Sequence, residues 1–348
     1  MTREMRSSPG SFGCELTGYG SGPFTAFREL KGLAIILLVL HYARSVLGWD
    51  NTLQFDLGIS VLFIVGGMTL GLAPAPTRAG PFLAGRLVRI LPAYWIVLTL
   101  YGVCNVHFRQ LSYSLFNVAI HYLGLQGWFG DAYGLAFAEP LCLVTLILAF
   151  PIFYSIGHPL VETPSRLLLV GAVIAAAVSG GYHFSGQSAM YSYLGQPLPG
   201  FFLGLILGRL LRTGRLEFSL GPALAAAAVI LIYVPYINGI VFNAPLAGLS
   251  LIGLYLFVWK RLASPGARLR MARILTFFGN YWLEILLIYV PLIREYNLYL
   301  HGRWLGIAAP TGGSLLLGMA IGLAVTLVFS VALRTLLRKI PSSLLPAT

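Results

Sequence analysis

The chain has 348 residues, of which 57% are hydrophobic and only 10% charged, and its mean hydropathy is +0.82. Soluble domains carry about 25% charged residues, so this composition excludes a water-soluble globular protein, and three cysteines exclude a disulfide scaffold. The net charge of +12 lies on residues between apolar runs and not in a basic domain, which excludes nucleic acid as a partner.

Apolar runs long enough to cross about 30 Å of hydrocarbon recur along the chain and predict an all-α, polytopic membrane helical bundle. Residues 1–26 are rich in Gly, Ser and Thr and are predicted to form a flexible cytoplasmic tail. Residues 27–339 are predicted to form a single transmembrane domain, followed by a second cytoplasmic tail at 340–348. The predicted spans lie at about 30–48, 55–73, 87–106, 133–154, 167–182, 198–211, 219–237, 244–259, 275–293 and 313–333.

A weaker apolar run at about 113–126 is too short to cross the bilayer and is predicted to be an interfacial or re-entrant helix. The distribution of basic residues supports this interpretation, because cytoplasmic loops carry an excess of Lys and Arg. If 113–126 does not span, 19 of the 23 Lys and Arg residues face the cytoplasm. The sequence therefore predicts ten transmembrane helices plus one short helix, with both termini cytoplasmic.

Ionisable side chains inside the bilayer cost free energy, and each one is therefore a functional hypothesis. His41 lies ten residues beyond Lys31, about 15 Å deeper along the first span, where a neutral imidazole could act as a general base. A histidine that bonds a backbone carbonyl in the core is an equal alternative. Glu139, in the fourth span, could orient His41 or form a structural ion pair with Arg44. Glu284, in the ninth span, is predicted to pair with an arginine.

Arg86 and Arg89 lie three residues apart at the cytoplasmic start of the third span, which places both guanidinium groups on one helix face. Two guanidinium groups beside the positive end of a helix dipole suit a phosphate or pyrophosphate. The competing interpretation is an ordinary positive-inside anchor. The remaining histidines show no metal-ligand spacing, so no metal site is predicted.

These patterns, taken in order, resemble the acyltransferase-3 family of integral-membrane acyltransferases over about residues 27–335. The strongest piece is FLAGRLVRILPAYW at 82–95, which resembles the family's Arg-x-x-Arg-x-x-Pro-x-Tyr-Trp stretch. FRELKGLAIILLVLHY, YGLAFAEPLCLVTLILAFP, LPGFFLGLILGRLL and FFGNYWLEILLIYVPL resemble its opening, Glu-Pro, Phe-Phe-x-x-Gly and late helices. The chain departs from the family at Gly66-Gly67-Met68 and at Tyr289, where the family carries Ser-Gly-Phe and a histidine.

The resemblance implies transfer of an acyl group, usually acetyl from acetyl-CoA, to a hydroxyl of a cell-surface glycan or lipid-linked saccharide in a bacterial inner membrane. For that activity, the chemistry of the residues predicts Lys31, Arg86 and Arg89 as the donor-binding residues and His41 and Glu139 as the catalytic residues. His41 would act as the general base or carry the acyl group briefly, and Glu139 would orient its imidazole. Arg44, Tyr94, Glu284 and Tyr289 are expected to support the site. Two other classes remain open on the residues alone: a transporter or flippase with a path lined by ionisable residues, and a non-catalytic scaffold.

Overall fold

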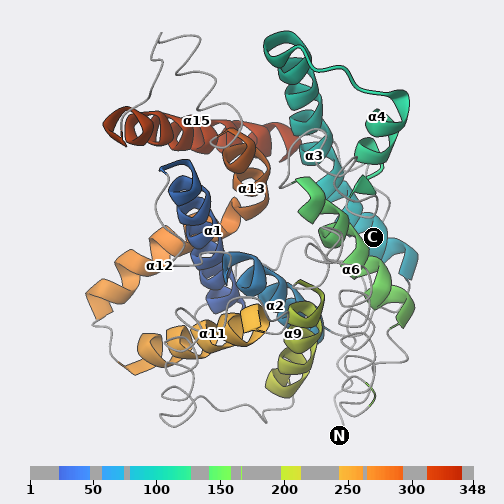
Figure 1. Ribbon diagram of the computed structural model, residues 1–348. Helices are drawn as coiled ribbons and strands as arrows, with labels where there is room; N and C mark the ends of the chain where they lie inside the picture. Colours follow the sequence, from blue (N-terminus) through green and yellow to red (C-terminus); the bar gives the residue numbers. More distant parts are fainter. Residues whose placement is uncertain are drawn as a thin grey trace, which may run out of the picture.

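The computed structural model describes residues 23–47, 57–73, 79–126, 141–157, 166, 197–212, 243–261, 265–292 and 312–338. The described part of the chain is all-helical, without strands (Figure 1). This confirms the all-α part of the predicted fold class. Its helices are α1 (Pro23–Leu47), α2 (Leu57–Leu72), α3 (Ala79–Arg109), α4 (Leu115–Tyr122), α6 (Cys142–Gly157), α9 (Pro197–Arg212), α11 (Asn243–Arg261), α12 (Pro265–Asn280), α13 (Trp282–Pro291) and α15 (Gly312–Arg338).

Two described helices are long and apolar enough to cross a membrane, at Ala79–His107 in α3 and Gly313–Leu337 in α15. A third crossing results if α12 and α13 are counted together as one bent span. Three shorter apolar helices overlap predicted spans, at Leu57–Leu72, Leu143–Ser155 and Pro245–Phe257. The predicted spans at 167–182 and 219–237 lie outside the described residues.

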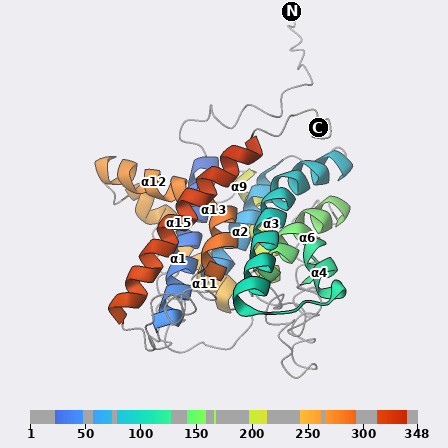
Figure 2. The same cartoon turned by 90° about the horizontal axis from the view of Figure 1, so that it is seen from above.

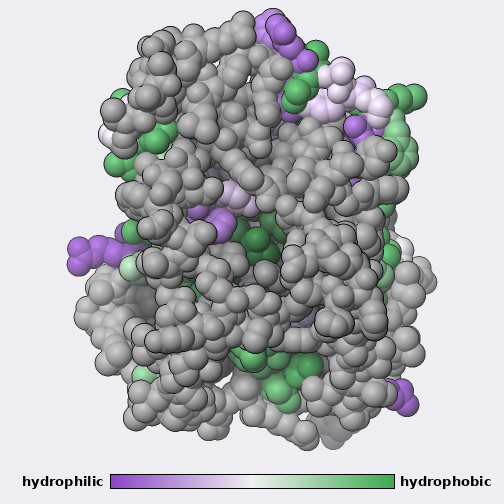
Figure 3. Space-filling view, viewed as in Figure 1, coloured by the Kyte–Doolittle hydropathy of each residue, from purple (hydrophilic) through white to green (hydrophobic). Residues whose placement is uncertain are grey.

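One face of α15 is apolar and exposed. Leu317, Ile321, Val325 and Val328 are exposed along it, whereas Leu333 is buried against the bundle. Only a helix satisfies all its backbone hydrogen bonds internally, so an apolar helix surface is stable against hydrocarbon. In the view of Figure 3, apolar side chains of described residues also reach the surface at the upper right, where α3 and α4 lie in Figure 1.

Glycines allow a very close helix contact between α2 and α9. A Cβ on Gly67 would lie 2.1 Å from the carbonyl oxygen of Phe201, and one on Gly204 would lie 2.0 Å from that of Ile64. Lipid tails are as apolar as leucine, so helices associate in membranes through van der Waals packing that small residues allow. The glycines therefore allow the two backbones to pack closely, with the last turn of α9 beside the end of α2.

The ninth predicted span, at 275–293, contains a break. The helix α12 ends at Asn280, α13 begins at Trp282, and the two segments are bent by 66°. Arg334 of α15 donates a hydrogen bond to the carbonyl oxygen of Asn280, and its guanidinium lies 5.0 Å from the ring centroid of Tyr281. A cation that satisfies the last carbonyl of a helix stabilises that end, so Arg334 supports the break.

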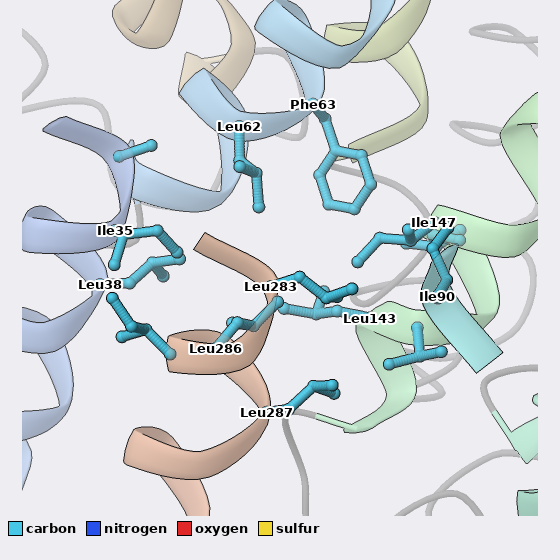
Figure 4. Close-up of a cluster of buried hydrophobic side chains, with 14 of the residues drawn as sticks. Ile35, Leu38, Leu62, Phe63, Ile90, Leu143, Ile147, Leu283, Leu286 and Leu287 are labelled. Atoms are coloured by element: carbon cyan, nitrogen blue, oxygen red, sulfur yellow. The ribbon is translucent and has the colours of Figure 1, made fainter. Parts of the chain in front are cut away.

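After the break, α13 enters the middle of the bundle, where it packs against α1, α3 and α15. Leu283, Leu286 and Leu287 of α13 belong to a buried cluster that also contains Leu38 of α1 and Ile147 of α6 (Figure 4). Loss of one such leucine would leave a cavity among closely packed neighbours. The central position of α13 fixes where its first residue, Trp282, meets α1.

The short helix α4 follows the prediction for 113–126. Its eight residues cover about 12 Å, too short to cross a bilayer. Ser114 caps its first turn by accepting a hydrogen bond from the Asn117 amide. The Trp95 indole donates a 2.8 Å hydrogen bond to the Tyr122 carbonyl oxygen, so the chain folds back along α3 as far as the middle of that helix.

Candidate functional site

Lys31 lies where α1 meets the start of α13. Its amino group is 5.7 Å from the ring centroid of Trp282, within the range of a cation–π interaction. The lysine is half-buried and lies close enough to Arg86 of α3 for their positive charges to repel each other. The structure thus brings together two of the three residues that the sequence assigned to the donor site.

Arg86 and Arg89 occupy one face of α3, as their spacing predicts. The Arg86 guanidinium lies 5.3 Å from the ring centroid of Phe82, one turn earlier in the helix. Arg89 lies close enough to repel Arg86 and is exposed, whereas Arg86 is half-buried. The aromatic ring holds one guanidinium in place, and the other remains accessible to a ligand.

Tyr154 of α6 links this pair to the ends of α2 and α9. Its hydroxyl donates a 3.2 Å hydrogen bond to the Leu70 carbonyl oxygen and accepts one from Arg209. Arg86 also lies within electrostatic range of this hydroxyl. Carbonyl groups in the last turn of a helix have no hydrogen-bond donor within their own helix. Tyr154 supplies a donor to one such carbonyl of α2, that of Leu70.

Arg212 contributes to the same region from the last turn of α9. Its Nη1 donates a 3.4 Å hydrogen bond to the Ala73 carbonyl oxygen, just beyond the end of α2, and its charge acts on Tyr154. Arg212 is exposed, whereas Arg209, one turn earlier, is 9% exposed. We call Lys31, Arg86, Arg89, Arg209 and Arg212 the basic cluster; they come from α1, α3 and α9.

The described carboxylates lie outside the basic cluster. The Glu29 carboxylate accepts a 2.9 Å hydrogen bond from the Tyr255 hydroxyl of α11, and Glu284 lies within electrostatic range of Arg334. No other acidic residue occurs in the parts of the chain that the structure describes. Five cations on α1, α3 and α9 create a positive potential that attracts a polyanion.

His41 occupies the position that the sequence predicts, on α1 and ten residues beyond Lys31. Its ring is half-buried and meets the Tyr42 ring edge-on, with centroids 5.1 Å apart and an interplanar angle of 86°. The helical rise places it about 15 Å along α1 from the lysine. His41 is therefore separated from Lys31 along the axis of α1.

The other predicted residues have different surroundings. Tyr94 is buried on α3, and its hydroxyl donates a 2.6 Å hydrogen bond to the carbonyl oxygen of His121, so it holds the returning segment and lies away from the basic cluster. Tyr289 is buried on α13. Glu284 has the arginine neighbour that the sequence predicted, and this neighbour is Arg334. Glu139 and the side chain of Arg44 lie outside the described residues.

Sequence reasoning missed Arg209, Arg212, Tyr154 and Trp282. The arginines were counted only as positive-inside anchors, although they repeat the three-residue spacing of Arg86 and Arg89. That repetition was a usable signal. Tyr154 and Trp282 carried none, because only the packing of α6 and α13 brings them to the cations.

The chain matches the acyltransferase domain of the acyltransferase-3 family over residues 27–335. It belongs to the acyltransferase-3 family. Comparison with curated proteins and with solved structures finds no match. Family membership and the apolar helices together indicate a membrane acyltransferase. In this acyltransferase-3 protein, the Arg-x-x-Arg motif lies in the basic cluster, and its aromatic end, Tyr94-Trp95, holds the segment that folds back along α3.

Proposed function

We propose that this chain is a membrane O-acyltransferase that moves an acyl group, acetyl in the simplest case, from acyl-CoA to a hydroxyl of a cell-surface glycan or lipid-linked saccharide. The observation that carries the proposal is the convergence of Lys31, Arg86 and Arg89 in a chain of this family. Guanidinium groups bind phosphates through paired hydrogen bonds, and CoA presents a pyrophosphate. The basic cluster therefore serves as the donor-binding surface.

The acyl group reacts deeper in the bundle, near His41. The imidazole removes the proton from the acceptor hydroxyl as its oxygen attacks the thioester carbonyl carbon. A carbon–oxygen bond forms, the carbon–sulfur bond breaks, and the CoA thiolate takes up the proton from the imidazolium. Glu139 orients the imidazole and stabilises its charged form, and Arg44 and Tyr289 support the site.

We also propose ten transmembrane helices with both termini in the cytoplasm of a bacterial inner membrane. Contacts among the helix ends support this topology. The ends of α2, α6 and α9 meet the start of α3 around Tyr154, which is the pairing that alternating spans require. In Figure 2, the first turns of α3 and the last turns of α15 also lie along the same edge of the bundle.

The test of activity uses the full-length protein in lipid nanodiscs, with labelled acetyl-CoA as donor and p-nitrophenyl glycosides as acceptor probes. We expect His41→Ala to lower kcat by about 10²–10⁴-fold, the usual contribution of a general base. Arg89→Ala should raise the KM for acetyl-CoA. Arg270→Gln, an exposed arginine on α12, is the matched control and should leave both constants unchanged. An unchanged kcat in His41→Ala together with an unchanged KM for acetyl-CoA in Arg89→Ala would contradict the mechanism.

The topology has a separate test. A cysteine introduced at Ser264, between α11 and α12, should react with a membrane-impermeant maleimide only after the inner face of the membrane is opened. The same labelling applied to a cysteine at Ser112, in the turn after α3, should succeed from the outer face. Labelling of position 264 in intact spheroplasts would overturn the ten-span arrangement.

A further inference from the structure

The basic cluster contains two arginine pairs with the same spacing on different helices. Arg86 and Arg89 lie on α3, and Arg209 and Arg212 lie on α9. Tyr154 interacts with both pairs. Its hydroxyl accepts a hydrogen bond from Arg209 and lies within electrostatic range of Arg86 and Arg212. The proposed donor needs one pair for its pyrophosphate, so the second pair calls for an explanation of its own.

The second pair is fixed in place by backbone contacts. Gly208, next to Arg209, packs so closely on α2 that an added Cβ would lie 2.3 Å from the Met68 carbonyl oxygen. Arg212 uses one N–H on the Ala73 carbonyl oxygen, and a guanidinium carries five such donors in a rigid fork. The close packing removes much of the side-chain and helix freedom that binding would otherwise have to restrict.

The chemistry of the donor supplies a second anionic group. CoA carries a 3′-phosphomonoester on its ribose in addition to the pyrophosphate, and a phosphomonoester has a charge of about −1.5 to −2 at neutral pH. The ribose separates the two groups, so one arginine pair on one helix turn cannot bind both in the paired geometry. Two pairs on separate helices, with residues of both in electrostatic range of Tyr154, can.

We propose that Arg209, Arg212 and the Tyr154 hydroxyl form a subsite for the 3′-phosphomonoester of the acyl donor, distinct from the pyrophosphate site at Arg86 and Arg89. This proposal rests on the proposed function and extends it to donor specificity. Arg209 and Arg212 donate to the phosphate oxygens, and Tyr154 keeps the α9 pair aligned with the α3 pair. The enzyme then discriminates CoA from nucleotides that lack this phosphate.

Binding measurements separate the subsite from catalysis. Isothermal titration of the full-length protein in phosphatidylcholine nanodiscs compares CoA with 3′-dephospho-CoA. We expect the wild type to bind CoA at least about tenfold more tightly, which corresponds to about 1.4 kcal/mol. Arg209→Gln and Arg212→Gln should each weaken CoA binding while leaving the affinity for dephospho-CoA unchanged. Arg89→Gln should weaken both ligands, and Arg270→Gln neither.

A conservative variant separates loss of the subsite from misfolding. Arg209→Lys keeps the charge and loses the fork, so it should fold with wild-type thermal stability and retain part of the preference for CoA. Equal affinities of the wild type for CoA and dephospho-CoA would overturn the subsite, as would equal losses for both ligands in Arg209→Gln. A wild type that prefers CoA but transfers no acyl group would retain the subsite and overturn the proposed activity.

A lipid headgroup is the other source of a phosphomonoester at a membrane surface. The titration is therefore repeated in nanodiscs that contain phosphatidic acid. If the donor occupies the subsite, phosphatidic acid should reduce the affinity for CoA by less than a few-fold. Binding of phosphatidic acid that depends on Arg209, together with no preference between CoA and dephospho-CoA, would assign the subsite to lipid and overturn the proposal.

Discussion

The Tyr94 hydroxyl donates a 2.6 Å hydrogen bond to the carbonyl oxygen of His121, 27 residues further along the chain. Tyr94 belongs to the family's most specific motif, and His121 lies at the end of α4, which folds back along α3. Both residues are fully buried. The motif thus has two roles on one helix: its arginines contribute to the basic cluster and its aromatic residues anchor the returning segment.

Removing the Tyr94 hydroxyl should weaken the attachment of α4 to α3 without creating a cavity in the core. In Tyr94→Phe, the His121 carbonyl loses its donor while the aromatic ring stays in place, so we expect the free energy of unfolding to fall by about 1–3 kcal/mol. Cysteine labelling at Leu115, which is 85% exposed, should stay unchanged, whereas labelling at Leu123 and Leu125 should become faster. Unchanged labelling rates at all three positions would contradict an anchoring role for this hydrogen bond.

The glycine contact between α2 and α9 predicts a large difference between two neighbouring substitutions. Gly204→Val places a side chain where a Cβ alone would lie 2.0 Å from the Ile64 carbonyl oxygen, whereas Gly66 has no atom within 4 Å of its Cβ position. We expect Gly204→Val to destabilise the protein by at least about 1–3 kcal/mol, because backbone must move. Gly66→Ala is the control. A thermal unfolding midpoint in Gly204→Val equal to that of the control would contradict the close packing.

The α12–α13 break predicts coupling between Arg334 and Glu284. Arg334→Gln removes the cation beside the Asn280 carbonyl and the Glu284 carboxylate, so we expect a loss of about 1–3 kcal/mol in the free energy of unfolding. A double-mutant cycle with Glu284→Gln measures the interaction between the two charges. Strictly additive effects would show that Arg334 acts on the break without Glu284. Arg273→Gln, an exposed residue of α12, serves as the control.

The buried carboxyl of Glu29 should make the stability of the protein depend on pH. Burial raises the pKa of its carboxyl above the ordinary value, and the hydrogen bond from Tyr255 opposes that rise. A raised pKa in the folded state means that the folded protein binds the proton more tightly, so the contribution of Glu29 to stability falls as the pH rises through that pKa. Tyr255→Phe removes the opposing hydrogen bond and should increase this loss.

The measurement compares unfolding midpoints at pH 5 and pH 8. We expect the destabilisation caused by Tyr255→Phe to be larger at pH 8, where the buried carboxyl must ionise without its donor. In the background of Glu29→Gln, the same substitution should have an effect that does not change with pH. An equal shift at both pH values with Glu29 present would show that Tyr255 stabilises the protein by packing alone.

Relationships along one helix could be predicted from the sequence. The spacing of Arg86 and Arg89 placed both on one face of α3, the distance from Lys31 placed His41 deeper on α1, and the length of the run at 113–126 excluded a crossing. These inferences needed only the helical rise and period and the thickness of a bilayer. The bend within the span predicted at 275–293 could not be predicted from local spacing, because the cation that supports the break at Asn280 comes from α15.

Composition and local spacing were therefore enough to establish a helical membrane protein, its family resemblance and the first arginine pair. Only the tertiary structure decided which helix ends meet, and with them the approach of Arg209 to Tyr154 and of Trp282 to Lys31. The physical reason is that a helix fixes the geometry of residues a few positions apart. Contacts between helices depend instead on which surfaces can approach closely, and here glycines on α2 and α9 set that approach.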